Sequence, residues 1–266
     1  MGKNRLDPGV RMPTPKVPIG PGRDAYSKRT RAILAAILGA VIAIAVTVGI
    51  IIAVKSPSTT ARSTTIPLAD RGASKELLAA AEAVGFRPNV EAGVGQVEDL
   101  PASAVSPSSN DSLIAVGTLA PEFSLRTPIG KRITLSSFRG KAVLLEFFTT
   151  WCPHCDAEAP YLEKLYASLD HSKIAFVAVN ADGEDAASVL AYHIYFGMSY
   201  PVLLDPSDHP GTFRFPGAAG PVTTYYRVAS YPTFYVIDTH GNVVWRGDGE
   251  QPNDLLRQEL LKATGM

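Results

Sequence analysis

The chain has very few cysteines: only two among 266 residues, both within Trp151-Cys152-Pro153-His154-Cys155. A structural disulfide more often ties distant segments together, because closing a long loop removes more entropy from the unfolded chain. Two thiolates without a third ligand at a recognisable spacing also leave a metal site incomplete. The scarcity of cysteine therefore argues against a local staple and against a metal carrier.

The chain also lacks net charge, with 25 basic and 25 acidic residues, but the two signs are unevenly distributed. Residues 1–31 carry eight basic and two acidic side chains, spread among prolines. The rest of the chain is therefore mildly acidic, which argues against a nucleic-acid ligand for it. We interpret the N-terminal stretch as a basic, Pro-rich cytoplasmic tail.

Long hydrophobic runs are absent except for Ala32 to Val54, which contains no charged residue, proline or amide side chain. As a helix rising about 1.5 Å per residue it reaches roughly 34 Å, enough to cross a bilayer core. It is too long for a cleaved signal peptide. Because basic residues stay on the cytoplasmic side, we predict a single-pass signal anchor in the cell membrane with the C-terminal bulk extracytoplasmic.

No internal repeat is present, and composition divides the remaining chain into two parts. Residues 55–116 are rich in Ser, Thr, Ala, Gly and Pro and predict an extracytoplasmic linker. Within it, Ser74 can cap a short helix near 74–84 that Gly85 ends. Residues 117–266 alternate strand and helix patterns and are long enough for one domain.

In that domain the sequence predicts an α/β fold with a mixed sheet covered by helices on both faces. A hairpin is expected at 123–135, buried strands at 142–148 and 174–179, a short strand at 200–204, and strands at 233–237 and 242–245. Helices are expected from Trp151 to about Leu169, at 184–196 and at 253–263. The Gly- and Pro-rich stretch 205–221 fits no regular element.

The cysteine pair follows a buried strand and opens a helix, which is the setting for thiol–disulfide exchange. Helix N–H groups and the helix dipole stabilise a thiolate at Cys152, so we assign it the attacking role. Cys155, one turn later, would resolve the mixed disulfide. His154 between them could stabilise the thiolate if protonated, or could be an exposed loop histidine of little effect.

Glu146 is a carboxylate in the middle of the strand Val143-Leu144-Leu145-Glu146-Phe147-Phe148. Burial of an unpaired charge is costly, so we predict a raised pKa or a partner, unless the side chain reaches water at a strand edge. The remaining histidines, His171, His193, His209 and His240, show no ligand spacing and are interpreted as surface residues.

Together, Trp-Cys-x-x-Cys after a buried strand and Tyr231-Pro232-Thr233-Phe234 entering a strand resemble the thioredoxin fold. Within it the chain looks most like the membrane-anchored TlpA/ResA group of thiol-disulfide oxidoreductases, with an AhpC/TSA–Redoxin-like domain. Further features carry this: Ala120-Pro121-Glu122-Phe123-Ser124-Leu125, Phe138-Arg139-Gly140-Lys141, Glu158 with Pro160, and a helix and strand inserted between about 184 and 204.

The resemblance implies a thioredoxin fold with an N-terminal hairpin and a central helix-strand insertion. It implies that Pro232 is cis and packs on the disulfide, that Glu146 accepts the proton of the resolving thiol, and that Glu158 is a proton relay. Trp151 and Pro232 would shape the peptide groove, with plain packing as the alternative. The implied function is reduction of exported clients such as apocytochrome c, with electrons from a membrane donor of the DsbD/CcdA type and no cofactor.

Three alternatives stay open at this point. Pro153-His154 is the dipeptide of the strongly oxidising DsbA type, so a disulfide oxidase uses the same residues with reversed electron flow. A peroxidase is disfavoured because position 145 is Leu where peroxiredoxins have a proline before the peroxidatic cysteine. A copper-binding chaperone suits soft thiolates but lacks a third ligand.

Overall fold

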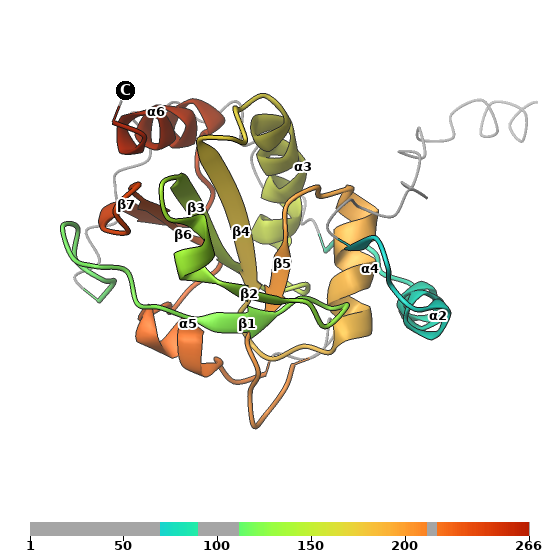
Figure 1. The fold of residues 1–266 in the computed structure, drawn as a ribbon. Coiled ribbons are helices and arrows are strands. Elements are labelled where there is room, and N and C mark those ends of the chain that lie inside the picture. The colour runs from blue at the N-terminus through green and yellow to red at the C-terminus, as the bar shows by residue number, and fades with distance from the viewer. Residues whose placement is uncertain (1–69, 90–111, 212–216, 266) are drawn as a thin grey trace, which may run out of the picture. The chain divides into compact units, whose positions relative to one another are not determined.

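A computed structural model describes residues 70–89, 112–211 and 217–265 (Figure 1). The predicted tail 1–31 and signal anchor 32–54 lie outside these residues, as does much of the predicted linker. Within the described part of the chain, no helix has the length and apolar character needed to span a membrane.

The centre of the fold is one mixed sheet in the order β2-β1-β5-β4-β3-β6-β7 (Figure 1). Strand β3 runs parallel to β4 and antiparallel to β6, and β4 runs parallel to β5. The strands are β1 (Ser124–Arg126), β2 (Arg132–Thr134), β3 (Ala142–Phe148), β4 (Ile174–Asn180), β5 (Val202–Leu204), β6 (Thr233–Ile237) and β7 (Val243–Asp248). The mixed sheet expected from the sequence is confirmed.

Strands β3 and β4 are buried along their whole length because both faces of the sheet are covered. Leu144 packs in the cluster on one face, with residues of α3 (Pro153–Ala167), α4 (Ala186–Phe196) and α6 (Asn253–Ala263). Leu145 packs on the other face, against the N-terminal hairpin and α5 (Pro221–Tyr225). This double burial explains the continuous apolar runs.

The predicted hairpin forms as β1 and β2, with Leu125 opposite Ile133. The irregular stretch after β5 begins at the buried Asp205, whose carboxylate accepts the N–H groups of Val222 and Thr223 at the start of α5. Helix α5 thus follows the Gly- and Pro-rich excursion. No helix was predicted from the sequence at this position.

Helix α2 (Lys75–Val84) has the predicted caps: the Ser74 hydroxyl accepts the N–H of Leu77 at 3.1 Å, and Gly85 takes a left-handed φ of 61°. The helix packs against α4. The interpretation of His193 as a surface residue is wrong. Its side chain is fully buried on α4, where Nδ1 bonds Asp70 and Nε2 bonds the carbonyl of Tyr200, because the segment before α2 covers this part of α4.

Candidate active site

The two cysteines lie where β3 ends and α3 begins, as the sequence predicts. Cys152 is the N-cap of α3, and its Sγ accepts the backbone N–H of Cys155 at 3.4 Å. Pro153 occupies the first turn, where a missing N–H costs nothing. Both thiols are free, and both residues are buried.

The environment separates the acidities of the two thiols. Hydrogen bonding from Cys155 is the main effect that lowers the pKa of Cys152 to about 7, and backbone N–H groups and His154 add to it. Burial raises the pKa of Cys155 well above its ordinary value, and hydrogen bonding to Cys152 raises it further. Cys152 is therefore the nucleophile near neutral pH and Cys155 the protonated resolving thiol.

Pro232 and Trp151 border the thiol pair. The Tyr231–Pro232 peptide is cis, directly before β6, and the carbonyl of Tyr231 accepts the thiol of Cys152 at 3.4 Å. The Trp151 ring meets the Tyr231 ring edge-on, with centroids 6.0 Å apart. These contacts place a main-chain carbonyl and two aromatic rings beside the reactive sulfur.

Glu146 is buried in β3, and its Oε2 has no hydrogen-bond partner among the described residues. Burial, and secondarily the neighbouring Cys152, raises the pKa of Glu146 to about 8. The side chain does not reach water at a strand edge. Glu146 is thus a neutral carboxylic acid at pH 7 that can exchange a proton with the thiol site.

Glu158, on the second turn of α3, is completely buried, so it is not a solvated helix carboxylate. Its Oε1 accepts the backbone N–H of Gln251 at 2.9 Å. Burial raises the pKa of Glu158 well above its ordinary value despite this bond. A second buried acid with a raised pKa therefore lies on the active-site helix.

His154 is exposed, with 55% of its side chain accessible, and its Nδ1 lies 2.6 Å from Oε1 of Glu250. The negative charge of Glu250 partly neutralises a protonated His154 imidazole, so the imidazole stabilises the Cys152 thiolate less. His154 is among the weaker influences on the Cys152 thiol.

Three further buried acids surround the site, and sequence reasoning missed all of them. Asp156 follows Cys155 on α3, while Asp182 and Glu184 follow β4. The Trp151 indole donates to Asp182 at 2.7 Å, and the Thr150 N–H donates to Glu184 at 2.8 Å. Their one sequence signal is position: Asp182 and Glu184 follow the parallel strand beside β3, so they lie at the same sheet edge as the cysteines.

Among the described residues, no group of three or more His, Cys, Asp or Glu side chains is arranged to hold a metal ion. Four carboxyl groups near the thiols are buried, and burial is the main effect that raises the pKa of each: Glu146, Asp156, Glu158 and Glu184. Buried carboxyl groups with raised pKa values can exchange protons with the thiols.

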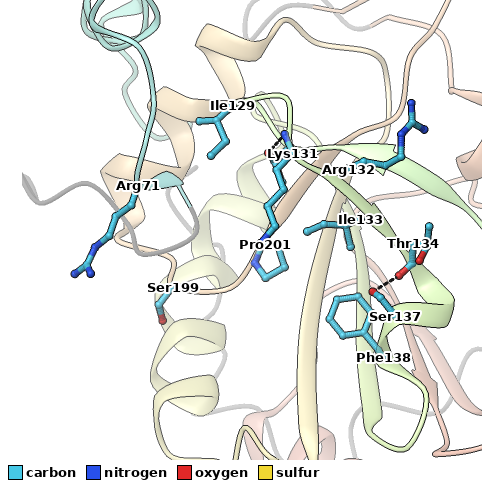
Figure 2. A pocket seen from close by; sticks show the side chains of 11 residues that line it. Arg71, Ile129, Lys131, Arg132, Ile133, Thr134, Ser137, Phe138, Ser199 and Pro201 are labelled. Atoms are coloured by element: carbon cyan, nitrogen blue, oxygen red, sulfur yellow. Dashed lines mark hydrogen bonds between the residues drawn. The ribbon is translucent and has the colours of Figure 1, made fainter.

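A hollow of about 740 Å³ lies elsewhere, between the β1–β2 hairpin and the start of β5 (Figure 2). Ile129, Ile133, Phe138 and Pro201 give it apolar walls, and Lys131 extends along it toward Pro201. Its lining includes neither the cysteines nor the buried acids described above. It is therefore separate from the thiol site.

Comparison with known proteins found similar sequences and structures. Residues 116–246 match the AhpC/TSA family. Thiol-disulfide oxidoreductase ResA of Bacillus cereus is 31% identical over 156 residues, covering 59% of this chain and 83% of the relative. ResA of Geobacillus kaustophilus is 35% identical over 130 residues, covering 49% and 67%. A Chlorobium tepidum structure described as a putative thiol:disulfide interchange protein DsbE aligns with a TM-score of 0.49 at 27% identity, covering 57% of this chain and 99% of that one.

The similarity to ResA of Bacillus cereus spans 83% of that relative, and the AhpC/TSA match at 116–246 includes both cysteines and the buried acids. The chain is a thiol-disulfide oxidoreductase, and it belongs to the ResA/TlpA-like group of the thioredoxin superfamily.

Proposed function

We propose that this protein is a membrane-tethered, extracytoplasmic disulfide reductase that acts on exported proteins, with apocytochrome c as a client. The observation that carries the direction of exchange is the acidity of Cys152, whose pKa is lowered only to about 7. Attacking cysteines of reducing thioredoxins have a pKa near 7, whereas that of the oxidant DsbA is near 3.5. A less stabilised thiolate makes the dithiol a better electron donor.

The reaction follows from the two acidities. The Cys152 thiolate attacks one sulfur of a client disulfide, forming a mixed disulfide and releasing a client thiolate. Cys155 then loses its proton and attacks Sγ of Cys152, which frees the second client thiol and leaves a Cys152–Cys155 disulfide. Two electrons pass to the client, and a membrane donor dithiol of the DsbD/CcdA type returns them.

The buried acids supply the proton handling that this sequence needs. Cys155 attacks only as a thiolate, yet burial holds its proton tightly. Glu146 contributes to the electrostatic environment of Cys155, and Glu158 interacts electrostatically with Glu146 and Cys152. We assign the ionised form of Glu146, which a pKa of about 8 leaves as a minority at pH 7, the role of proton acceptor for Cys155. We assign Glu158 the role of relay to the surface.

The reduction potential of the Cys152–Cys155 couple tests the direction. A value near or below about −250 mV is expected for a reductant of the thioredoxin kind. A value between about −120 and −180 mV would instead identify an oxidase or isomerase, in keeping with the Pro153-His154 dipeptide.

The proposed location rests on the apolar run 32–54 and the basic tail before it. We expect a membrane-impermeant maleimide to label Cys152 of a Cys155→Ala full-length protein in intact cells as fully as in lysed cells. Labelling only after lysis would place the thiol domain in the cytoplasm.

A further inference from the structure

Residues 70–89, called here the N-terminal arm, are fixed to α4 at two points. Asp70 pairs with His193 in the interior, and both side chains are almost fully inaccessible. Phe86 is buried and meets the ring of Tyr192 edge-on at 5.3 Å, with further edge contacts to Tyr195 and Phe196. These anchors determine where the last residue of the arm, Asn89, lies.

Asn89 makes two hydrogen bonds to the start of the active-site helix. Its backbone N–H donates to Oδ2 of Asp156, and its side-chain amide donates to the carbonyl of Trp151 at 3.2 Å. Asp156 is buried, its Oδ1 has no partner among the described residues, and its own N–H bonds the carbonyl of Cys152 at 3.0 Å. A buried carboxyl group is thus held by one main-chain donor beside the nucleophile.

Opposing effects act on this carboxyl group. Burial is the largest and raises the pKa of Asp156 to about 8, the Asn89 N–H lowers it, and charge on Cys152 or Glu184 raises it. The titratable groups around the nucleophile come from several elements: Cys155, His154, Asp156 and Glu158 on α3, Glu146 on β3, Glu184 after β4, Tyr192 on α4 and Tyr231 before β6.

Asp156 differs from the two acids assigned above. Burial is the main effect that raises the pKa of Glu146 and of Glu158, and each has a buried carboxyl oxygen without a partner among the described residues. The backbone N–H of Asp156 bonds the carbonyl of Cys152, and the Asn89 N–H, from a segment distant in the chain, holds its carboxyl group beside that residue. A charge on Cys152 raises the pKa of Asp156, so reduction of the disulfide, which creates that charge, favours the protonated form of Asp156.

We propose that Asp156 is the group that gains a proton when the Cys152–Cys155 disulfide is reduced, and that Asn89 is the positioning residue that holds it for this purpose. A donor dithiol supplies two electrons and becomes a disulfide, and the S–S bond breaks. One proton goes to the sulfur of Cys155. The second goes to the Asp156 carboxylate, which leaves Cys152 as the thiolate.

This inference rests on the thiol chemistry of the proposed function, but not on the direction of exchange or the client. Its test is the pH dependence of the reduction potential between pH 7 and 8. Uptake of two protons with two electrons changes the equilibrium constant a hundredfold per pH unit, about 59 mV, and uptake of one proton changes it tenfold, about 30 mV. The wild type is expected to follow the two-proton slope.

Three variants separate the roles. Asp156→Asn keeps the shape of the side chain but cannot ionise, so the slope should fall to one proton. Asn89→Pro removes the N–H that favours the carboxylate, so Asp156 stays protonated in both redox states and the slope should also fall. Asn89→Ala keeps that N–H, loses only the bond to Trp151, and should retain the two-proton slope.

Carbon-13 NMR of the Asp156 carboxyl group gives a readout independent of turnover. Its titration midpoint should be higher in the reduced protein than in the oxidised protein by about one pH unit or more. Equal midpoints, or an Asp156→Asn variant that retains the two-proton slope, would overturn the inference. A potential outside the reductant range with the two-proton slope intact would refute only the proposed direction.

Discussion

The Trp151 indole N–H donates to the Asp182 carboxylate at 2.7 Å, and this bond joins the active-site turn to the excursion after β5. The same oxygen accepts the N–H of Gly217 at 3.0 Å, and the Asp182 carbonyl accepts the N–H of Gly211 at 2.8 Å. A side chain at Gly217 would collide with Asp182 and Gly211, so the backbone approach here requires glycine. Asp182 therefore connects both described parts of the excursion, residues 205–211 and 217–221, to the active-site tryptophan.

We expect Asp182→Ala to destabilise the fold by about 1–3 kcal/mol, since two donors lose their acceptor. With Trp151 released, the KM for a protein disulfide should rise, while the reaction with a small dithiol, which needs no groove, should change little. Steady-state kinetics with both substrates and urea unfolding measure these effects. Asp208→Ala, an exposed residue of the same excursion, is the control. Equal losses with both substrates would contradict a groove role.

The acidity of Cys152 predicts a pH profile. In the fully reduced wild-type protein, alkylation of Cys152 by iodoacetamide should rise with pH through a midpoint near its pKa of about 7, since only the thiolate reacts. Cys155 should react far more slowly, because burial raises the pKa of its thiol well above the ordinary value. A midpoint at about 8.5, the value of a free cysteine, would show that the site does not stabilise the thiolate.

Glu146 predicts how stability changes with pH. Its folded pKa, raised to about 8, exceeds the unfolded value, so the folded state binds more protons and loses stability as pH rises from about 4.5 to about 8. Relative to the wild type, Glu146→Gln should gain up to about 1.4 kcal/mol per pH unit across that window. Urea titrations at several pH values measure it, with the exposed Glu82→Gln as control. A difference that does not vary with pH would mean that Glu146 is charged in the fold.

We predict that the buried pair of Asp70 and His193 stabilises the packing of the N-terminal arm on α4. Asp70→Ala leaves a buried imidazole without its partner and should cost about 1–3 kcal/mol of stability. Amide hydrogen exchange over α2 should accelerate more than exchange over β3, because Asp70 holds the part of the arm that leads into α2. Arg71→Ala changes the neighbouring exposed residue and serves as control. Unchanged exchange over α2 would show that Phe86 alone holds the arm.

Much of the fold could be predicted from the sequence, because it depends on local patterns. The run Ala142–Phe148 predicts a doubly covered strand, and Ser74 and Gly85 predict the ends of α2. The Cys-x-x-Cys spacing after that strand likewise predicts the nucleophile at the N-cap of α3. In each of these cases the physical cause lies within a few residues of the feature, so the feature can be predicted without knowledge of long-range contacts.

The protonation of the site could not be read in this way. Asp156, Glu184 and His193 look like ordinary polar residues of helices and turns, yet all three are buried. Their burial comes from segments distant in the chain: Asn89 covers Asp156, Thr150 bonds Glu184, and Asp70 covers His193.

The sequence by itself therefore determined the elements, the reactive pair and the kind of chemistry, since hydrophobic period, capping and cysteine spacing are local properties. Only the tertiary structure decided which acids are buried and how far the acidities of the two thiols differ. The reason is physical: a pKa depends on how much water and charge surround a group, and those surroundings are assembled from residues as far apart as Asn89 and Asp156.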